Sequence, residues 1–184
     1  MISLREDVRI PNVLAIDPGG QGAFCFLSLS LKVCFFEDMP TTLTQWDRLF
    51  SIIKPWNVEV IVVEDVHSLY GMSARSNFTF GGAVKTANIV PYLASGIEPI
   101  KIQPKTWQKL VNVRFPPKTP PNERKKISSI RAEELYQDLS FADIFDVEAS
   151  LRGPKGGLKD GRVDAFLIGM AYLLKEKYIE TDST

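Results

Sequence analysis

The chain has 184 residues, of which 45% are hydrophobic and 24% charged, a composition typical of one globular domain and not of a disordered or fibrous chain. Its two cysteines and single histidine exclude a four-ligand zinc site, so any metal would have to be bound by carboxylates. The 22 basic and 22 acidic residues cancel, which by itself argues against a nucleic-acid partner. No run is long enough to span a membrane and no signal peptide precedes the domain, so we expect a cytoplasmic protein without a membrane partner.

Apolar runs bounded by turn residues predict the strands of the fold. These runs are residues 12–16, 22–31, 32–37, 58–63 and 98–102. The first three are expected to form a meander, and the first and fourth are almost entirely apolar, as in strands buried on both faces.

Helical patterns separate and follow these strands. They cover residues 41–53, 78–93, 104–109, 123–139 and 160–178. Residues 115–122, with four prolines, and 151–159, rich in glycine, are expected to be loops. The order of elements predicts a single α/β domain over residues 1–184, with a core at about 12–178 and a mixed five-stranded sheet flanked by helices.

The zero net charge conceals a strong segregation along the chain. Residues 101–131 carry nine bases and one acid, a net charge of +8, whereas residues 132–148 carry six acids and no base. The basic run is either a phosphate-binding surface or a solvated helix face. Its candidate phosphate contacts are Lys105, Lys109, Lys118, Arg124, Lys125 and Lys126.

Four carboxylates stand where α/β sheets place their ligands. Asp17 and Glu64 end two buried strands, and Asp160 and Asp164 share one face of the last predicted helix. Three of them have ordinary alternatives: Asp17 can stabilise a turn, Glu64 can reach solvent, and Asp160 can cap the helix. Asp164 lies within an apolar pattern, where an uncompensated charge is costly. Hard divalent cations relieve repulsion between such acids, and Mg²⁺ is the natural candidate.

Five segments, in this order, resemble the successive motifs of RuvC-type Holliday junction resolvases, especially phage-type members of that family. They are residues 16–19 (IDPG), 63–67 (VEDVH), 76–81 (SNFTFG), 103–107 (QPKTW) and 159–168 (KDGRVDAFLI). One such motif is weakly specific, but five in order over about residues 12–175, at spacings that fit one ribonuclease H-like domain, are strongly specific.

The resemblance implies a metal-dependent crossover junction endodeoxyribonuclease that acts as a homodimer on four-way DNA junctions, in a bacterial or phage-infected host cell. It implies catalytic, metal-binding roles for Asp17, Glu64 and Asp164. Bacterial RuvC places a fourth acid three residues before the last one, where this chain has Gly161. Because other resolvases of the group use a spacing of four, we assign the fourth acid to Asp160.

The resemblance also implies two Mg²⁺ per active site, with Mn²⁺ as an expected substitute and Asp17 as the bridging ligand. His67, Tyr70 and Lys155 complete the expected DNA-binding residues. Tyr70, Met72 and Phe78 follow the strand of Glu64, where the family places residues that open the junction and an aromatic ring can stack on a base. The alternatives are a structural role for His67 and core packing for Phe78. The helix over residues 78–93 is the expected dimer interface, with Gly81 and Gly82 allowing close packing.

Two other functions remain as alternatives. One is a broader branched-DNA debranching or repair endonuclease of the same fold, because four acids carry no junction specificity. The other, more remote, is an actin-like or sugar-kinase-like nucleotide-binding domain, whose first strand also ends in an Asp and glycines. That fold normally repeats its core, and this chain has no second Asp-Gly strand turn.

Overall fold

A computed structural model of the protein describes residues 2–5, 7–67, 71, 73–139, 151 and 159–181, without the side chains of residues 52 and 53. Five strands form one mixed sheet, in the order β4-β3-β2-β5-β6. They are β2 (Val13–Asp17), β3 (Ala23–Ser28), β4 (Val33–Asp38), β5 (Val60–Glu64) and β6 (Ile100–Ile102). The central strand β2 is antiparallel to β3 and parallel to β5, which confirms the predicted mixed five-stranded sheet.

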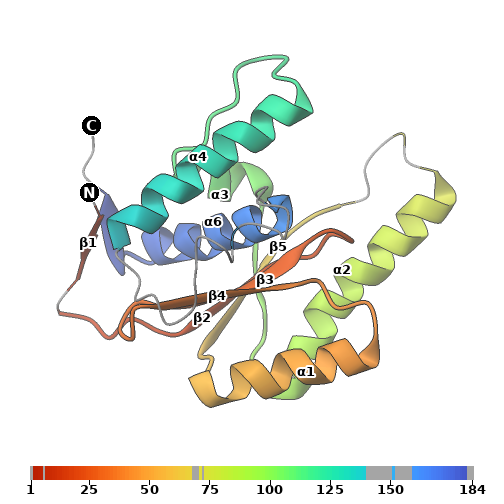
Figure 1. The fold of residues 1–184 in the computed structure, drawn as a ribbon, viewed down its shortest axis with the longest axis horizontal. Helices are drawn as coiled ribbons and strands as arrows, with labels where there is room; N and C mark the ends of the chain where they lie inside the picture. The colour runs from red at the N-terminus through yellow and green to blue at the C-terminus, as the bar shows by residue number, and fades with distance from the viewer. Residues whose placement is uncertain are drawn as a thin grey trace.

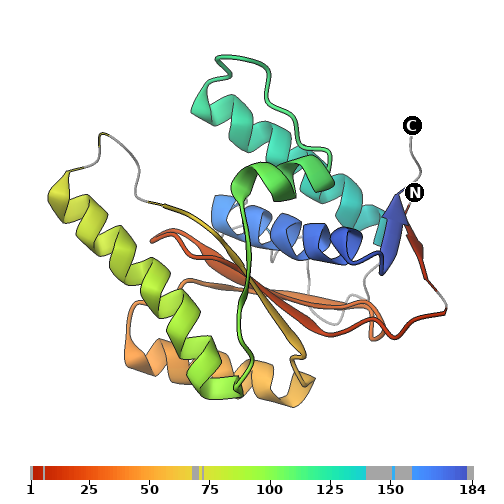
Figure 2. The same cartoon turned by 180° about the vertical axis from the view of Figure 1, so that it is seen from behind.

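Helices cover both faces of this sheet (Figure 1 and Figure 2). On one face lie α1 (Leu43–Ile53), followed by the short 3₁₀ turn η1 (Lys54–Trp56), and α2 (Ala74–Ser95). On the other face lie α3 (Pro104–Leu110), α4 (Pro121–Leu139) and α6 (Asp160–Lys175). Because β2 contributes side chains to a core on each face, its sequence has to be apolar throughout.

The last helix is shorter than the sequence predicts, and a strand follows it. The helix ends at Lys175 instead of near residue 178, and Lys177 adopts a left-handed conformation with φ of 58°. The chain then forms β7 (Ile179–Thr181), which pairs antiparallel with β1 (Ile2–Leu4) and brings the two ends of the described chain together (Figure 1). This two-stranded sheet depends on a pairing between distant segments that no local pattern indicates.

Some smaller predictions are wrong or lie outside the described part. α4 begins at Pro121, two residues before its predicted start, because proline fits the first turn of a helix. Phe78 is 86% exposed and so does not pack in the core. Gly81 and Gly82 mediate no close packing among the described residues, since a Cβ built at either would meet nothing within 4 Å. The predicted loop over residues 151–159 falls mostly outside the described residues.

No helix within the described part of the chain is both long and apolar enough to cross a membrane.

Candidate active site

Asp17 and Glu64 lie at the same edge of the sheet. β2 and β5 run parallel, and their register pairs Ile16 with Val63, so the next residue of each strand is a carboxylate. Asp17 Oδ1 also accepts a hydrogen bond from the backbone N–H of Gly19 at 3.3 Å. The buried apolar strands therefore set two acids at the carboxyl edge of the parallel strands, where α/β sheets bind ligands.

The start of α6 brings Asp160 and Asp164 to this edge. Gly161 forms a bridge with Gly22, so the first turn of the helix rests on the turn between β2 and β3. A Cβ at position 161 would lie 2.2 Å from the Gln21 carbonyl oxygen, which is fixed backbone. This backbone leaves no room for a side chain at position 161, and the acid that the helix start brings close to Asp17 and Asp164 is Asp160.

The Gly161 contact predicts a strong effect of a single methyl group. We expect Gly161→Ala to lower the free energy of unfolding by about 1–3 kcal/mol, because the turn between β2 and β3 has to move. Gly20→Ala is the matched control, since a Cβ at position 20 meets nothing within 4 Å. Chemical denaturation of both variants checks this, and equal stabilities would contradict the described contact.

Burial raises the pKa values of three of the acids, and repulsion by neighbouring charges adds to the rise for Asp17 and Asp164. Loss of hydration raises the pKa of Asp17 to about 7, with a further contribution from the charges of Glu64 and Asp160. Desolvation, followed by the charges of the other three acids, raises the pKa of Asp164 well above its usual value. Desolvation also raises the pKa of Glu64. The acids thus interact electrostatically, as groups that share a cation do.

Lys125 of α4 places a positive charge next to these acids. Its ammonium forms an ion pair with the carboxylate of Asp160 and partly offsets the raised pKa of Asp164. The two side chains of the ion pair are 54% and 42% exposed, so the pair contributes little stability. The sequence predicts Lys125 as a phosphate contact, and that role stays a prediction.

Glu64 is bound by a neutral donor. The indole Nε1 of Trp107 donates a hydrogen bond to Glu64 Oε1 at 2.7 Å. Sequence reasoning gave Trp107 no role beyond its place in one motif. The available signal was that a buried indole N–H needs an acceptor, and an acid at a strand end supplies one.

In the present conformation, no three His, Cys, Asp or Glu side chains of the described residues lie close enough to hold one metal ion together. Glu64 is bonded to Trp107 and Asp160 to Lys125 instead. The oxygen-only donor set and the raised pKa values of its acids nevertheless suit a hard divalent cation, which would draw these carboxylates together.

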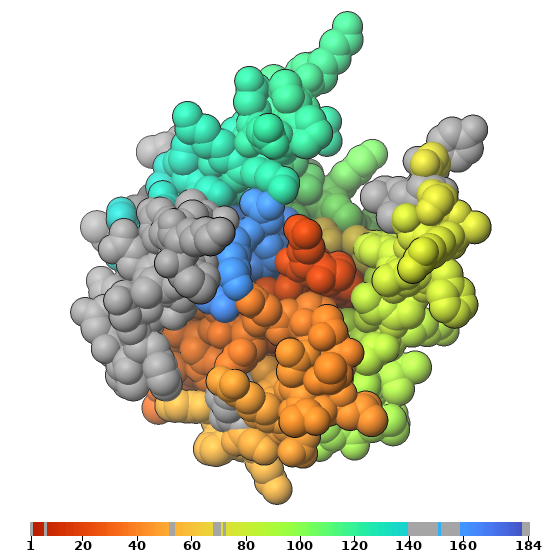
Figure 3. All heavy atoms as spheres, turned by 45° about the vertical axis from the view of Figure 1, so that its right-hand side comes forward, coloured from red at the N-terminus to blue at the C-terminus, as the bar shows by residue number. Residues whose placement is uncertain are grey.

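Two hollows flank Asp160. One of about 210 Å³ is also lined by Glu64, Asp164, Trp107 and Lys125. The other, of about 370 Å³, lies over the turn between β2 and β3. Figure 3 shows this turn, in red and orange, between α4 and α2, which stand out on either side of it. The acids therefore lie beside open surface that a substrate can reach.

An ion-pair cluster, which the sequence did not indicate, ties the start of α6 to β4. Asp38 accepts a hydrogen bond from Arg162 Nε at 2.8 Å and forms an ion pair with Lys159. These two bases lower the pKa of Asp38 despite the opposing effect of partial burial. Because 124 residues separate Asp38 from Arg162, no local pattern could reveal the cluster.

Two of the expected DNA-binding residues, Arg124 and Lys125, line the same hollow as Glu64, Asp160 and Asp164. The described members on α3, α4 and the loop between them are all exposed: Lys105, Lys109, Lys118, Arg124, Lys125 and Lys126. Arg124 is additionally held by Phe115, whose ring centroid lies 5.5 Å from the guanidinium carbon. His67 is exposed in the segment after β5, whereas Tyr70, Met72 and Lys155 lie outside the described residues.

Comparison with known proteins identifies the fold. No protein-family model matches the chain, and no curated protein matches its sequence. Thermus thermophilus RuvC in complex with a Holliday junction substrate is similar in structure, with a TM-score of 0.55 at 10% sequence identity, covering 90% of this chain and 95% of that one. The chain has the RuvC fold.

A second T. thermophilus RuvC structure has a TM-score of 0.54 at 14% identity, with the same coverage of 90% and 95%. A fowlpox virus resolvase bound to Holliday junction DNA overlaps less closely, with a TM-score of 0.44 at 14% identity over 90% of this chain and 98% of that one. The RuvC fold confirms the predicted ribonuclease H-like architecture. At these identities, the roles of individual residues have to be argued from the geometry above.

Proposed function

We propose that this protein is a divalent-metal-dependent endonuclease that cleaves four-way DNA junctions by paired symmetric nicks. The observation that carries the proposal is the convergence of Asp17, Glu64, Asp160 and Asp164 at the open edge of a RuvC-fold sheet. Two further observations support it. An exposed basic surface on α3 and α4 adjoins the acids, and T. thermophilus RuvC has been solved with a Holliday junction substrate.

The four carboxylates would hold the metal. Oxygen ligands favour Mg²⁺, with Mn²⁺ as a substitute. Asp17, Glu64, Asp160 and Asp164 would together hold two ions in each site. When bound, such a pair of ions activates water and stabilises the leaving oxygen of a phosphodiester.

The rest of the chain keeps these acids in place and brings DNA to them. The Gly22–Gly161 contact and the cluster around Asp38 hold the start of α6, and thus Asp160 and Asp164. Lys125 neutralises Asp160 while no cation is bound. A cation at Asp160 would release the Lys125 ammonium, which then lies within reach of a phosphate at the same edge.

Cleavage of a synthetic four-way junction, beside a linear duplex of the same sequence, tests the proposal. With Mg²⁺ we expect paired nicks in the junction and none in the duplex, and with EDTA no cleavage of either. Equal rates on flaps and three-way junctions would indicate a broader debranching or repair endonuclease. The absence of cleavage on every substrate would overturn the proposal.

Lys125 and Lys126 are adjacent in the sequence but have different expected roles. Both are exposed on α4, but only Lys125 is paired with Asp160. We expect Lys126→Ala to weaken junction binding and to make the slope of log K against log salt concentration less steep by about 0.9, the value for one lost phosphate contact. Cleavage at saturating protein should not change. We expect Lys125→Ala to change the cleavage rate as well.

Binding across a salt series and single-turnover cleavage separate these effects. Lys54→Ala is the control, because Lys54 lies at the end of α1 on the opposite face of the sheet. Unchanged salt dependence in Lys126→Ala would place the DNA elsewhere, and unchanged cleavage in Lys125→Ala would make its contact with Asp160 incidental.

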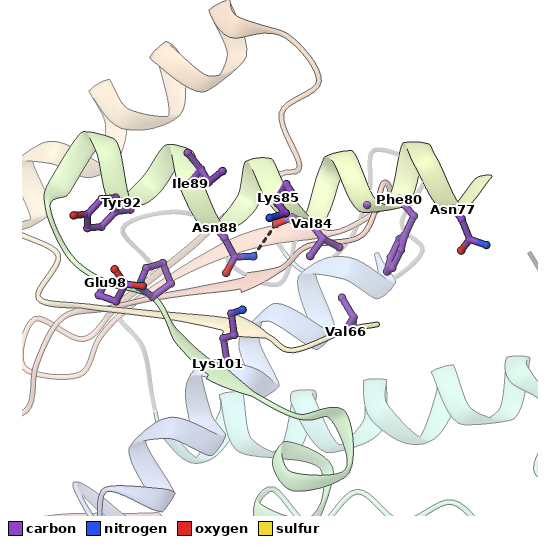
Figure 4. A pocket seen from close by; sticks show the side chains of 12 residues that line it. Val66, Asn77, Phe80, Val84, Lys85, Asn88, Ile89, Tyr92, Glu98 and Lys101 are labelled. Carbon is purple, nitrogen blue, oxygen red and sulfur yellow. Dashed lines mark hydrogen bonds between the residues drawn. The ribbon is translucent and has the colours of Figure 1, made fainter. Parts of the chain in front are cut away.

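We also propose that the protein acts as a homodimer, because two coordinated nicks on a junction need two sites related by twofold symmetry. The proposed interface is the outer face of α2, which exposes Phe78 by 86%, Ile89 by 48% and Leu93 by 74%. Gly81 and Gly82 on this helix leave room for the close approach of a second helix. A groove of about 410 Å³ runs beside this face, between α2 and β6, with Asn88 and Lys101 pointing into it (Figure 4).

Light scattering tests the dimer. The wild type is expected at twice the chain mass of 20.6 kDa, and Ile89→Glu combined with Leu93→Glu at the mass of one chain. Ile130→Glu is the matched control, since Ile130 is 47% exposed on α4, away from α2. A wild-type monomer, both free and on junction DNA, would contradict the proposed assembly.

A further inference from the structure

We propose that Trp107 is a positioning residue that holds Glu64 ready for a metal ion. This inference rests on the proposed function, because it assigns Glu64 to the metal site. It concerns a residue that touches neither DNA nor metal in the arrangement described above. Trp107 acts through the carboxylate to which its indole donates a hydrogen bond.

The short connection between β6 and α3 places Trp107 next to Glu64. Glu64 is the register partner of Ile102 where β5 pairs with β6. After Ile102 the chain turns directly into α3, which begins at Pro104, and Trp107 lies in the first turn of that helix. Its backbone N–H donates to the carbonyl of Gln103 at 3.1 Å. The indole therefore reaches the acid from the helix that directly follows the neighbouring strand.

Packing fixes the orientation of the indole. Trp107 is 2% exposed and belongs to the core that α3, α4 and α6 form on one face of the sheet. A ring so enclosed cannot turn freely, so its N–H has one direction. Because that N–H binds Oε1, it restrains the orientation of the carboxylate and leaves Oε2 available to a cation.

The chemistry of the donor distinguishes this contact from the one at Asp160. The Lys125 ammonium is a cation and has to leave when a metal occupies its place, whereas an indole N–H is neutral and does not compete for that place. Trp107 thus stabilises a charged carboxylate in a partly buried position without neutralising it. Outer partners of this kind typically affect metal affinity by about 10–100-fold.

A purely structural reading gives Trp107 only the task of filling the core, with Glu64 as a convenient acceptor. The two readings differ in what happens to metal binding when the N–H is removed and the fold is kept. In the structural reading, Glu64 keeps its orientation and its affinity for metal. In ours, the carboxylate loses its fixed orientation and metal binds less tightly.

The test is calorimetric titration of the DNA-free protein with Mn²⁺. We expect Trp107→Phe to weaken Mn²⁺ binding by about tenfold or more. Trp46→Phe is the matched control, because Trp46 is 6% exposed in the core on the opposite face of the sheet. In a Glu64→Gln background, adding Trp107→Phe should have no further effect, since Trp107 acts through the carboxylate.

A second substitution removes the N–H without leaving a cavity. Benzothienylalanine at position 107 retains the shape of the indole and replaces its N–H by sulfur. We expect it to weaken Mn²⁺ binding as Trp107→Phe does, while the packing of the core around position 107 is kept. Wild-type affinity in this variant would overturn the inference and leave the proposed function standing. A wild-type protein that binds no Mn²⁺ would overturn both.

Discussion

Asp17→Asn and Glu64→Gln are each expected to reduce junction cleavage below a tenth of the wild-type rate, while junction binding stays intact or becomes tighter. A tenfold loss corresponds to about 1.4 kcal/mol of barrier, and the removal of a metal ligand should exceed it. Binding should not suffer, because each substitution removes a negative charge from an edge that has to accept phosphate.

Single-turnover cleavage with Mg²⁺ and equilibrium binding with EDTA measure the two effects separately. Asp65→Asn is the matched control, since it removes the carboxylate next to Glu64 in the sequence. Cleavage above a tenth of the wild-type rate in either variant would remove that residue from the active site. Asp160→Asn completes the series. Normal cleavage by this variant at low Mg²⁺ would show that Asp160 is not a metal ligand and has only a structural role at the start of α6.

In the absence of metal, the protein should become less stable as the pH rises from about 4 to about 7. Burial and neighbouring charges raise the pKa of Asp17 from 3.8 to about 7 in the folded state. Between these values the folded protein holds a proton that the unfolded chain has lost, so raising the pH favours unfolding. Asp164, whose pKa is also raised, adds to the effect.

The expected loss of stability is a few kcal/mol, or about 5–10 °C in Tm for a chain of this size. Thermal unfolding in EDTA at pH 5 and pH 8 measures it. Asp17→Asn should unfold at a higher temperature than the wild type at pH 8, because the amide cannot ionise. Adding Mn²⁺ to the wild-type protein at pH 8 should raise its Tm again. A metal-free Tm that stays constant or rises over this range would contradict the described burial of the acids.

Much of the fold could be predicted because its core strands are encoded locally. The apolar runs of β2 and β5, each ended by an acid, indicate buried parallel strands whose carboxyl ends meet. The β1–β7 pairing and the true end of α6 could not be predicted in this way. Three-residue strands carry too little pattern, and their partners come from opposite ends of the chain.

The acids of the site were predictable for a related reason. A charged carboxylate is costly at the end of a buried strand or on the apolar face of a helix, where Asp164 lies. An acid in such a position is therefore recognisable in the sequence as a candidate site residue. The groups around the acids are not recognisable in this way. Trp107 looks like any core aromatic, and Lys125 looks like its neighbour Lys126 in an exposed basic helix.

The sequence by itself determined which residues carry charge at the ends of apolar segments, and hence the four acids and the order of strands and helices. Only the tertiary structure decided how those acids are held. It placed a neutral indole on Glu64, an ammonium on Asp160 and the backbone of residues 21–22 against Gly161. The physical reason is that strands and helices follow from periodicities a few residues long, whereas these contacts join segments that come together only when the sheet and α6 pack.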